Sequence, residues 1–446
     1  MMEPYHTGLL GLLSNSLILR QTAPYLPPIG LLNLAATSKY LRELIYSSPE
    51  AWRYLNLTGL RFLSIDSSPL DIGGISWRAE RMDESLTEDD FYAGPLRGIF
   101  GRLHQKDVLR NVQTLILDGL SVPADLVREI VAEDRYNVKI LSIREAKNLN
   151  QTKLRQVLRY ITRPTRAEET PRLKALYVFG SKDGATRGHP THKPPPSPVA
   201  SAAGVMAAEG AQIGAEWNHK SSKALSSCLD DDEQRWYMCN GRVIKTPSSS
   251  EWADTLQACQ GIIAFDAVLC RGPRHDITRT SAQEYLSPAV ASIALGPTGC
   301  QSCGSCPEGS ALFGVSSEST LPLIAPPPSH ASRVRPAQRP TMHADRSFPP
   351  LFLRCEVCLA GRWCERCNRW WCEDCYHKPS CTQVHLHSDG DQQQMSLQRE
   401  RDSSSPSTNG ARVTDTAQIK VYSKLCVEHC LVSEMMYGAG SNGMWG

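Results

Sequence analysis

The sequence lacks a long apolar run, a marked net charge and a recognisable secretory leader. No stretch approaches the ~20 apolar residues that cross a bilayer, so we expect no membrane-spanning segment. Lys and Arg together number 48 and Asp and Glu 46, and this balance disfavours nucleic acid or a membrane surface as a partner. Glu3 makes the start acidic, and residues 14–16 interrupt the apolar run Gly8–Leu19, which is atypical of a leader. We therefore expect a cytoplasmic or nuclear protein whose thiols stay reduced.

Cysteine, by contrast, is abundant: the chain has 16, and most of them lie in its last third. Three successive C-x-x-C pairs occur at Cys355/Cys358, Cys364/Cys367 and Cys372/Cys375. A fourth pair, Cys426/Cys430, follows a long polar insert. A C-x-x-C pair places two thiolates on one turn, about as far apart as a tetrahedral Zn²⁺ needs. The segment is too short to bury a sizeable core, so the pairs predict a small domain stabilised by zinc. Unrelated buried cysteines and a disulfide cluster are less consistent with this spacing and compartment.

Four pairs suggest two zinc ions. A cross-braced arrangement would place on one ion Cys355, Cys358, Cys372 and Cys375. The other ion would bind Cys364, Cys367, Cys426 and Cys430. Competing ligands are Cys381, His377 and His429. The spacing alone does not settle which pairs share an ion. We expect Trp363, Trp370 and Trp371 to supply most of the apolar packing of this domain.

A further cysteine cluster, Cys300, Cys303 and Cys306, lies on a Gly-rich loop. Three thiolates there would need a fourth ligand, and a loop without metal is the alternative. Candidates for that fourth ligand are Cys239, Cys259 and His275.

Cys270, His275 and Asp276 are close in sequence, which invites a nucleophile interpretation. A catalytic Cys and His usually come from separate elements of a fold, and no nucleophile elbow surrounds these residues. We therefore assign no catalytic residue and expect a protein that is not an enzyme.

Residues 5–57 are expected to be helical. One face of a helix is marked at helical spacing by Leu31, Leu34, Ser38, Leu41 and Ile45. Three prolines between residues 24 and 28 separate it from an earlier apolar helix around Leu12–Thr22. Pro49 opens a third, short helix that carries Trp52.

This segment resembles the F-box. Its apolar positions are matched by Leu17, Ile18, Leu31, Leu34, Leu41 and Trp52. Ser38-Lys39 matches the family's Ser-Lys/Arg step and Leu55-Asn56-Leu57 its L-x-L close, whereas Ser14 stands where proline is usual. The resemblance implies that those six apolar side chains dock to the Skp adaptor of a Skp–cullin–F-box ubiquitin ligase. The alternative is that the same leucines form an internal core.

Residues 58–180 contain three similar strand-like words, which are Val112–Leu117, Val138–Ile143 and Leu173–Val178. Helix-like stretches, Ala124–Glu133 and Gln151–Tyr160, lie between them. A strand and a helix repeating every 20–29 residues or so are typical of leucine-rich repeats. Such repeats commonly follow an F-box and there form a concave surface for substrate. An ordinary α/β domain is the alternative.

The whole sequence predicts a multidomain α+β protein. It comprises a small helical F-box, an α/β leucine-rich-repeat-like region, disordered Pro/Ser-rich linkers and a small zinc-stabilised C-terminal domain. The expected boundaries are 5–57, 58–180, a linker at 181–212, a mixed globular region at 213–315, a Pro-rich linker at 316–350, and the cysteine-rich domain at 351–436 with a disordered insert at 386–416.

This layout is similar to that of fungal F-box proteins with a cysteine-rich C-terminus. It implies a substrate-recognition adaptor that binds the Skp adaptor, a cullin scaffold and a protein substrate, with the zinc domain binding protein. The alternative is a RING-like ubiquitin ligase, whose cysteine domain would recruit a ubiquitin-conjugating enzyme through Trp370 or Trp371.

Overall fold

The computed structural model describes residues 8–60, 88–167, 170–182, 241–244, 250–280, 284–296, 298–304, 309–329, 334–339, 350–376 and 419–438. The chain divides into two compact units. The first comprises Met1–Pro297 and Glu308–Cys358, and the second comprises Thr298–Pro307 and Leu359–Gly446. The expected linker beyond residue 182 and the insert at 386–416 lie outside the described residues. Within the described ranges, no helix is long and apolar enough to cross a membrane.

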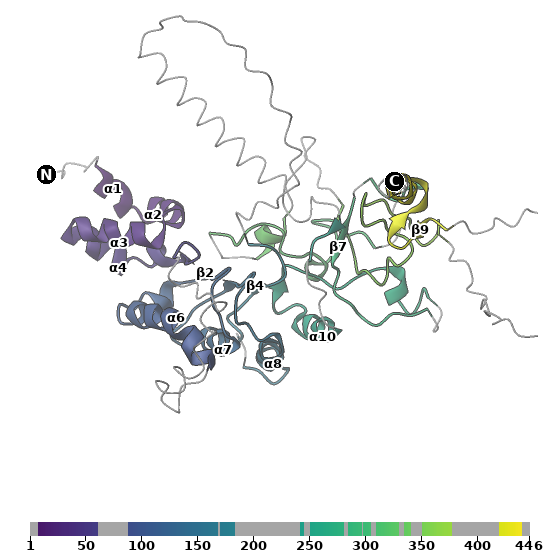
Figure 1. Ribbon diagram of the computed structural model, residues 1–446. Helices are drawn as coiled ribbons and strands as arrows, with labels where there is room; N and C mark the ends of the chain where they lie inside the picture. Colours follow the sequence, from purple (N-terminus) through teal and green to yellow (C-terminus); the bar gives the residue numbers. More distant parts are fainter. Residues whose placement is uncertain are drawn as a thin grey trace, which may run out of the picture. The chain divides into compact units, whose positions relative to one another are not determined.

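The sequence predicts helix here, but the helix expected around Leu12–Thr22 and the helix expected from Leu31 to Ile45 are each divided in two, the second at Ser38, whose backbone is extended. The described part of the first unit therefore begins with short helices. They are α1 (Leu9–Ser14), α2 (Ser16–Thr22), α3 (Pro28–Thr37) and α4 (Lys39–Ser47) (Figure 1). Pro28 occupies the first turn of α3, where its missing N–H is not needed. Ser38 caps α4, since its side chain accepts a hydrogen bond of 3.1 Å from the N–H of Leu41. These local signals explain why one apolar stretch becomes several helices.

Trp52 lies between these helices and the first strand and packs against α4. It ends the 3-10 helix η2 (Pro49–Trp52), and its side chain is buried. The indole N–H donates a 3.0 Å hydrogen bond to the carbonyl of Ile45 in α4, and the ring stacks on Tyr46. Strand β1 (Tyr54–Asn56) follows directly.

A five-stranded parallel sheet runs through the described part of the first unit, in the order β1-β2-β3-β4-β6. Its further strands are β2 (Thr114–Ile116), β3 (Ile140–Ser142), β4 (Ala175–Tyr177) and β6 (Ala264–Phe265). The three strand-like words of the sequence contain β2, β3 and β4, so these strand predictions are confirmed. β6 lies in an apolar run whose pattern does not distinguish strand from helix.

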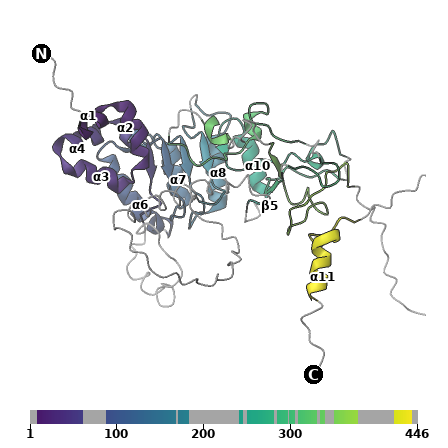
Figure 2. The same cartoon turned by 90° about the horizontal axis from the view of Figure 1, so that it is seen from above.

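Helices connect these strands. They are α6 (Glu88–His104), α7 (Ala124–Ala132), α8 (Gln151–Ile161) and α10 (Ser250–Cys259). Each contacts the next, and they lie in one row when seen from above (Figure 2). Parallel strands require such crossover connections, because a hairpin cannot join them. The first unit is therefore a mixed α/β structure, and the predicted helices after β2 and β3 are confirmed.

Buried carboxylates hold the loops at the ends of the strands. Asp118 accepts hydrogen bonds from the guanidinium of Arg144 at 2.7 and 3.0 Å and from its N–H at 2.8 Å. Asp266 accepts from the N–H groups of Val178, Phe179 and Gly180 at 2.9, 3.0 and 2.7 Å. These bonds satisfy donors that the ends of the strands would otherwise leave unpaired.

An antiparallel three-stranded sheet, ordered β5-β7-β8, also belongs to the described part of the first unit. It consists of β5 (Gly241–Arg242), β7 (Ile293–Leu295) and β8 (Phe352–Arg354). The sequence placed residues 351–358 in the cysteine-rich domain, whereas the structure places them in the first unit, because β8 pairs with β7. Short 3-10 helices complete this unit: η1 (Ala23–Tyr25), η5 (Leu109–Asn111), η6 (Pro273–His275), η7 (Glu318–Thr320) and η8 (Arg335–Gln338).

The described part of the second unit holds little regular structure. It contains the antiparallel pair β9 (Val421–Tyr422) and β10 (Leu425–Cys426), the π-helix η9 (Val427–Leu431) and helix α11 (Val432–Gly438). Elements this short bury little apolar surface, so on their own they stabilise the described part of this unit only weakly.

The Asp118–Arg144 pair provides a test of the sheet. We expect Arg144→Met to destabilise the first unit by roughly 3–5 kcal/mol, because it leaves a buried carboxylate without its partner. Arg159→Met is the matched control, since Arg159 is half-exposed and pairs with Asp254 at the surface; its effect should stay within about 0.5 kcal/mol. Urea unfolding followed by circular dichroism measures both, and equal midpoints for the two variants would contradict this assignment.

Candidate metal centres

A first group of four cysteines lies in the second unit. Its members are Cys300, Cys303, Cys372 and Cys375, and their sulfurs all lie within 4.8 Å of one another. The sulfurs of Cys303 and Cys372 are 3.7 Å apart. Two thiolates on a tetrahedral Zn²⁺ with bonds of ~2.3 Å are separated by about 3.8 Å. The group therefore has the dimensions of a structural zinc site.

Backbone hydrogen bonds shape this group from two distant segments. The N–H of Cys372 donates to the sulfur of Cys300 at 3.2 Å, and the N–H of Gln301 donates to the carbonyl of Trp370 at 2.9 Å. Gly304 closes the first segment by donating to the carbonyl of Cys300 at 2.8 Å, with a φ of 67° that favours glycine. These hydrogen bonds thus define the turn after Cys300 and bring it to the segment that carries Cys372.

A second group of four cysteines also lies in the second unit. Its members are Cys364, Cys367, Cys426 and Cys430, again within 4.8 Å of one another. The sulfurs of Cys367 and Cys426 are 3.7 Å apart. The wide turn of η9 lets the N–H of Cys430 donate to the sulfur of Cys426 at 3.4 Å. This is the ligand set that the sequence predicted for one ion.

The electrostatics of the second group favour a cation. Burial opposes ionisation of Cys364, but the N–H groups of Cys367 and Cys426 outweigh it and lower the pKa of Cys364 to about 7. Burial and contact with the sulfur of Cys426 raise the pKa of Cys430. Four adjacent sulfurs cannot all ionise without a compensating positive charge, and Zn²⁺ supplies that charge when it is bound.

The tryptophans between the cysteine pairs form the apolar part of the second unit. Trp363, Trp370 and Trp371 are buried, as expected, and Trp363 and Trp370 form a β-bridge. The buried side chain of Arg362 donates to the carbonyl of Trp371 at 2.9 Å and pairs with Glu373 at 2.7 Å. This packing positions Cys364 and Cys372 at its two ends.

The expected grouping of Cys355 and Cys358 with Cys372 and Cys375 does not occur. Cys300 and Cys303 lie with Cys372 and Cys375 instead. Their own C-x-x-C spacing was the sequence signal that could have predicted this grouping. Cys355 and Cys358 follow β8 in the first unit and lie instead beside Cys270 and His275.

Two of the remaining candidate ligands lie among the described residues, and neither belongs to a four-cysteine group. His429 is exposed and belongs to neither four-cysteine group, and Cys259 is buried in α10. Outside the described residues lie Cys239, Cys306, His377 and Cys381.

The six apolar residues matched to the F-box occupy three kinds of environment. Leu17 is 68% exposed, whereas Leu31 and Trp52 are 2% and 1% exposed and belong to the core. The other three, which are half-buried, are Ile18, Leu34 and Leu41. Further exposed apolar side chains on this segment are Leu9, Leu12, Tyr25, Ile29 and Leu32. The exposed surface is therefore formed largely by neighbours of the predicted residues, because the predicted ones include the inward face.

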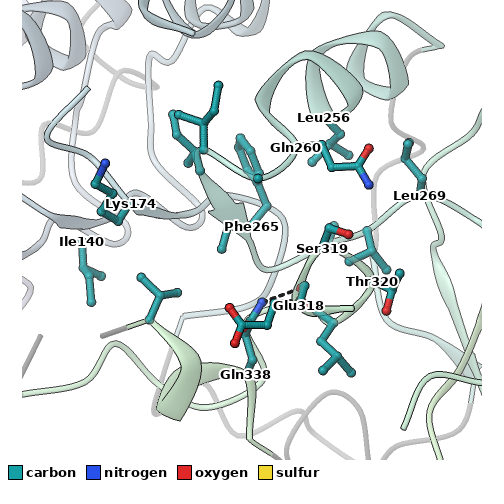
Figure 3. A pocket seen from close by; sticks show the side chains of 18 of the residues that line it. Ile140, Lys174, Leu256, Gln260, Phe265, Leu269, Glu318, Ser319, Thr320 and Gln338 are labelled. Atoms are coloured by element: carbon teal, nitrogen blue, oxygen red, sulfur yellow. Dashed lines mark hydrogen bonds between the residues drawn. The ribbon is translucent and has the colours of Figure 1, made fainter. Parts of the chain in front are cut away.

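A cavity of about 500 Å³ opens in the first unit near the starts of β3, β4 and β6 (Figure 3). Lys174, Gln260 and Phe265 contribute to its wall. Gln338 fixes one side by donating to the carbonyls of Glu318 at 2.9 Å and Leu321 at 2.7 Å. This mixture of apolar and polar groups is typical of a binding cavity.

Comparison with protein-family models, with curated proteins and with solved structures found no match for this chain.

The pairing of cysteines can be tested with a single variant. Cys300→Ser should lower the zinc content of the purified chain by one ion, because it removes a ligand that Cys303, Cys372 and Cys375 cannot replace. Elemental analysis against protein concentration measures the change. If Cys355 and Cys358 shared an ion with Cys372 and Cys375, the zinc content of Cys300→Ser would be unchanged.

Proposed function

We propose that the chain is a non-catalytic, substrate-recognition adaptor of a Skp–cullin–F-box ubiquitin ligase, acting in the cytoplasm or nucleus. In this proposal the N-terminal helices bind the Skp adaptor, the strand–helix region binds a protein substrate, and the zinc-stabilised unit is a further protein-binding module.

The exposed apolar surface of the N-terminal helices carries the proposal. Leu9, Leu12 and Leu17 on α1 and α2, and Ile29 and Leu32 on α3, all expose large apolar side chains to solvent. Their neighbours Leu19, Leu31 and Ile45 fill the interior of the same helices. A segment that already has an interior and still exposes this many leucines is typical of a surface that binds a partner.

The sheet supports the substrate-binding part of the proposal. Successive strands lie side by side in chain order, and the helices between them contact one another in the same order. Adjacent, sequential strand–helix units are what leucine-rich repeats form. The cavity near β3, β4 and β6 offers a place for a substrate side chain.

The cysteine groups favour a second candidate function. Within the two four-cysteine groups the pairs alternate along the chain: Cys300/Cys303 and Cys372/Cys375 form one group, and Cys364/Cys367 and Cys426/Cys430 form the other. This alternation is the cross-brace of RING-like modules, which would make the chain a ubiquitin ligase that recruits a ubiquitin-conjugating enzyme directly. Against it, Trp370 and Trp371, the expected contacts for that enzyme, are buried.

Exposed apolar residues give the sharpest test of adaptor binding. The double variant Leu17→Asp with Ile29→Asp should weaken binding to the Skp adaptor at least ~100-fold, since each change removes roughly 1.5–3 kcal/mol of apolar contact. Both side chains are more than half exposed, so the helices should still fold. Co-elution on size-exclusion chromatography and a pull-down titration measure the effect.

The matched control is Tyr160→Asp, which changes an exposed apolar side chain on α8 instead. It should bind the Skp adaptor as tightly as the unaltered chain. Unaltered binding by the Leu17/Ile29 variant would refute the F-box assignment. Formation of ubiquitin chains by the purified protein with a conjugating enzyme, and no added cullin, would instead support the RING-like function.

A further inference from the structure

A third cluster of metal-ligating side chains lies in the first unit and shares no residue with the two four-cysteine groups. The sulfurs of Cys270 and Cys358 and a ring nitrogen of His275 lie within 4.8 Å of one another. The sulfur of Cys355 is 3.2 Å from Nε2 of His275. Ligands on one tetrahedral Zn²⁺, with Zn–S of ~2.3 Å and Zn–N of ~2.0 Å, are separated by about 3.5–3.8 Å. The sulfurs of Cys270 and Cys358 and the imidazole nitrogen therefore converge at roughly the scale of one ion, and Cys355, which lies outside that mutually close group, contacts the imidazole as the candidate fourth ligand.

The hydrogen bonds of Nδ1 orient the ring of His275 so that Nε2 faces the cysteine sulfurs. Nδ1 lies 3.1 Å from the carbonyl oxygen of Leu286 and 2.9 Å from that of Ser287. A carbonyl oxygen can only accept, so Nδ1 carries the proton and Nε2 of the neutral ring has the lone pair. Metal-binding histidines typically donate their other N–H to a carbonyl in this way, which fixes the orientation of the ring.

Backbone N–H groups point at the sulfurs, as they do in the two four-cysteine groups. Cys270 accepts from the N–H of Gly272 at 3.5 Å and from that of Cys355 at 3.2 Å. Cys355 accepts from the N–H of Cys358 at 3.3 Å. Such bonds stabilise thiolates, which are the form of cysteine that binds zinc.

Gly272 and Arg354 lie directly beside the cluster, the first leaving space for a sulfur and the second providing a positive charge. A Cβ on Gly272 would lie 2.2 Å from the sulfur of Cys358, so the residue at this position must lack a side chain. The same site on Gly272 is 3.3 Å from the side chain of Arg354, which is 1% exposed. Three thiolates, a neutral imidazole and Zn²⁺ carry a net charge of −1, which the guanidinium of Arg354 would balance.

The fold brings these ligands together from segments that are about eighty residues apart in the chain. Cys270 follows a β-bridge between Leu269 and Val290, and His275 ends the 3-10 helix η6. Cys355 and Cys358 follow β8, which pairs with β7. A catalytic Cys–His pair would not need two further buried cysteines beside it, and one disulfide would leave the third thiol and the oriented imidazole without a role.

We propose that Cys270, His275, Cys355 and Cys358 form a third zinc site, structural in character, that ties the loop after β6 to the end of β8. It goes beyond the proposed function, because it requires neither adaptor binding nor the two four-cysteine groups. The site explains why Cys355 and Cys358 have C-x-x-C spacing although they do not join the pairs that follow them.

The zinc content of the full chain tests the proposal. The unaltered protein should contain three zinc ions per chain by elemental analysis. His275→Asn should contain two, because the amide can keep the hydrogen bond to the carbonyls but is a poor zinc ligand. His275→Cys should regain the third ion, since a thiolate replaces the imidazole. Cys259→Ser, which alters a buried cysteine outside all three groups, should keep three.

Cobalt substitution gives a readout that a change in folding alone would not produce. With Co²⁺ in place of zinc, His275→Cys should shift the visible absorption of one of three sites, as a sulfur replaces a nitrogen, while Cys259→Ser should leave the spectrum unchanged. Two zinc ions in the unaltered chain, with the same two in both His275→Asn and His275→Cys, would overturn the third site and leave the two four-cysteine groups intact.

Discussion

A tetrahedral zinc ion needs four ligand atoms within about 3.8 Å of one another, and each four-cysteine group of the second unit brings its sulfurs within 4.8 Å of one another. Its described strands and helices are only a few residues long, so apolar burial alone stabilises it weakly. The two four-cysteine groups join the loop around Cys300 to the turn at Cys372, and the turn at Cys364 to the η9 segment. Buried tryptophans fill the space between these cross-links.

The first unit meets the same problem of joining distant segments in a different way. β1, at the end of the N-terminal helical segment, joins the parallel sheet formed with strands later in the chain. Trp52, just before β1, connects it to α4 through the hydrogen bond to Ile45. The inward side of the helices is consumed by this packing, which leaves Leu17 and Ile29 on the outside. In the proposed adaptor, the surface that binds the ligase and the surface that binds substrate would thus be built on one continuous core.

Local patterns in the sequence were sufficient for much of the fold. The word Val138–Ile143 is a buried apolar run and forms β3, and Asn150 caps α8 by accepting from the N–H of Lys153. Helical spacing also identified the N-terminal helices, but it could not say which face is inward, since Leu31 is buried and its neighbour Leu32 is exposed. The grouping of cysteines was harder, because C-x-x-C spacing fixes a pair locally, whereas the pairs that share an ion depend on strand pairing. Cys355 follows β8, which pairs with β7 in the first unit, and it lies there beside His275.

X-ray absorption at the zinc edge of the purified full chain would test this account most directly, because it reports the atoms bound to the metal. We expect the atoms bound to zinc to be almost entirely sulfur at ~2.3 Å, with one imidazole nitrogen among the ligands of three ions. A shell dominated by nitrogen or oxygen would contradict it, since the converging cysteines would then not be the ligands.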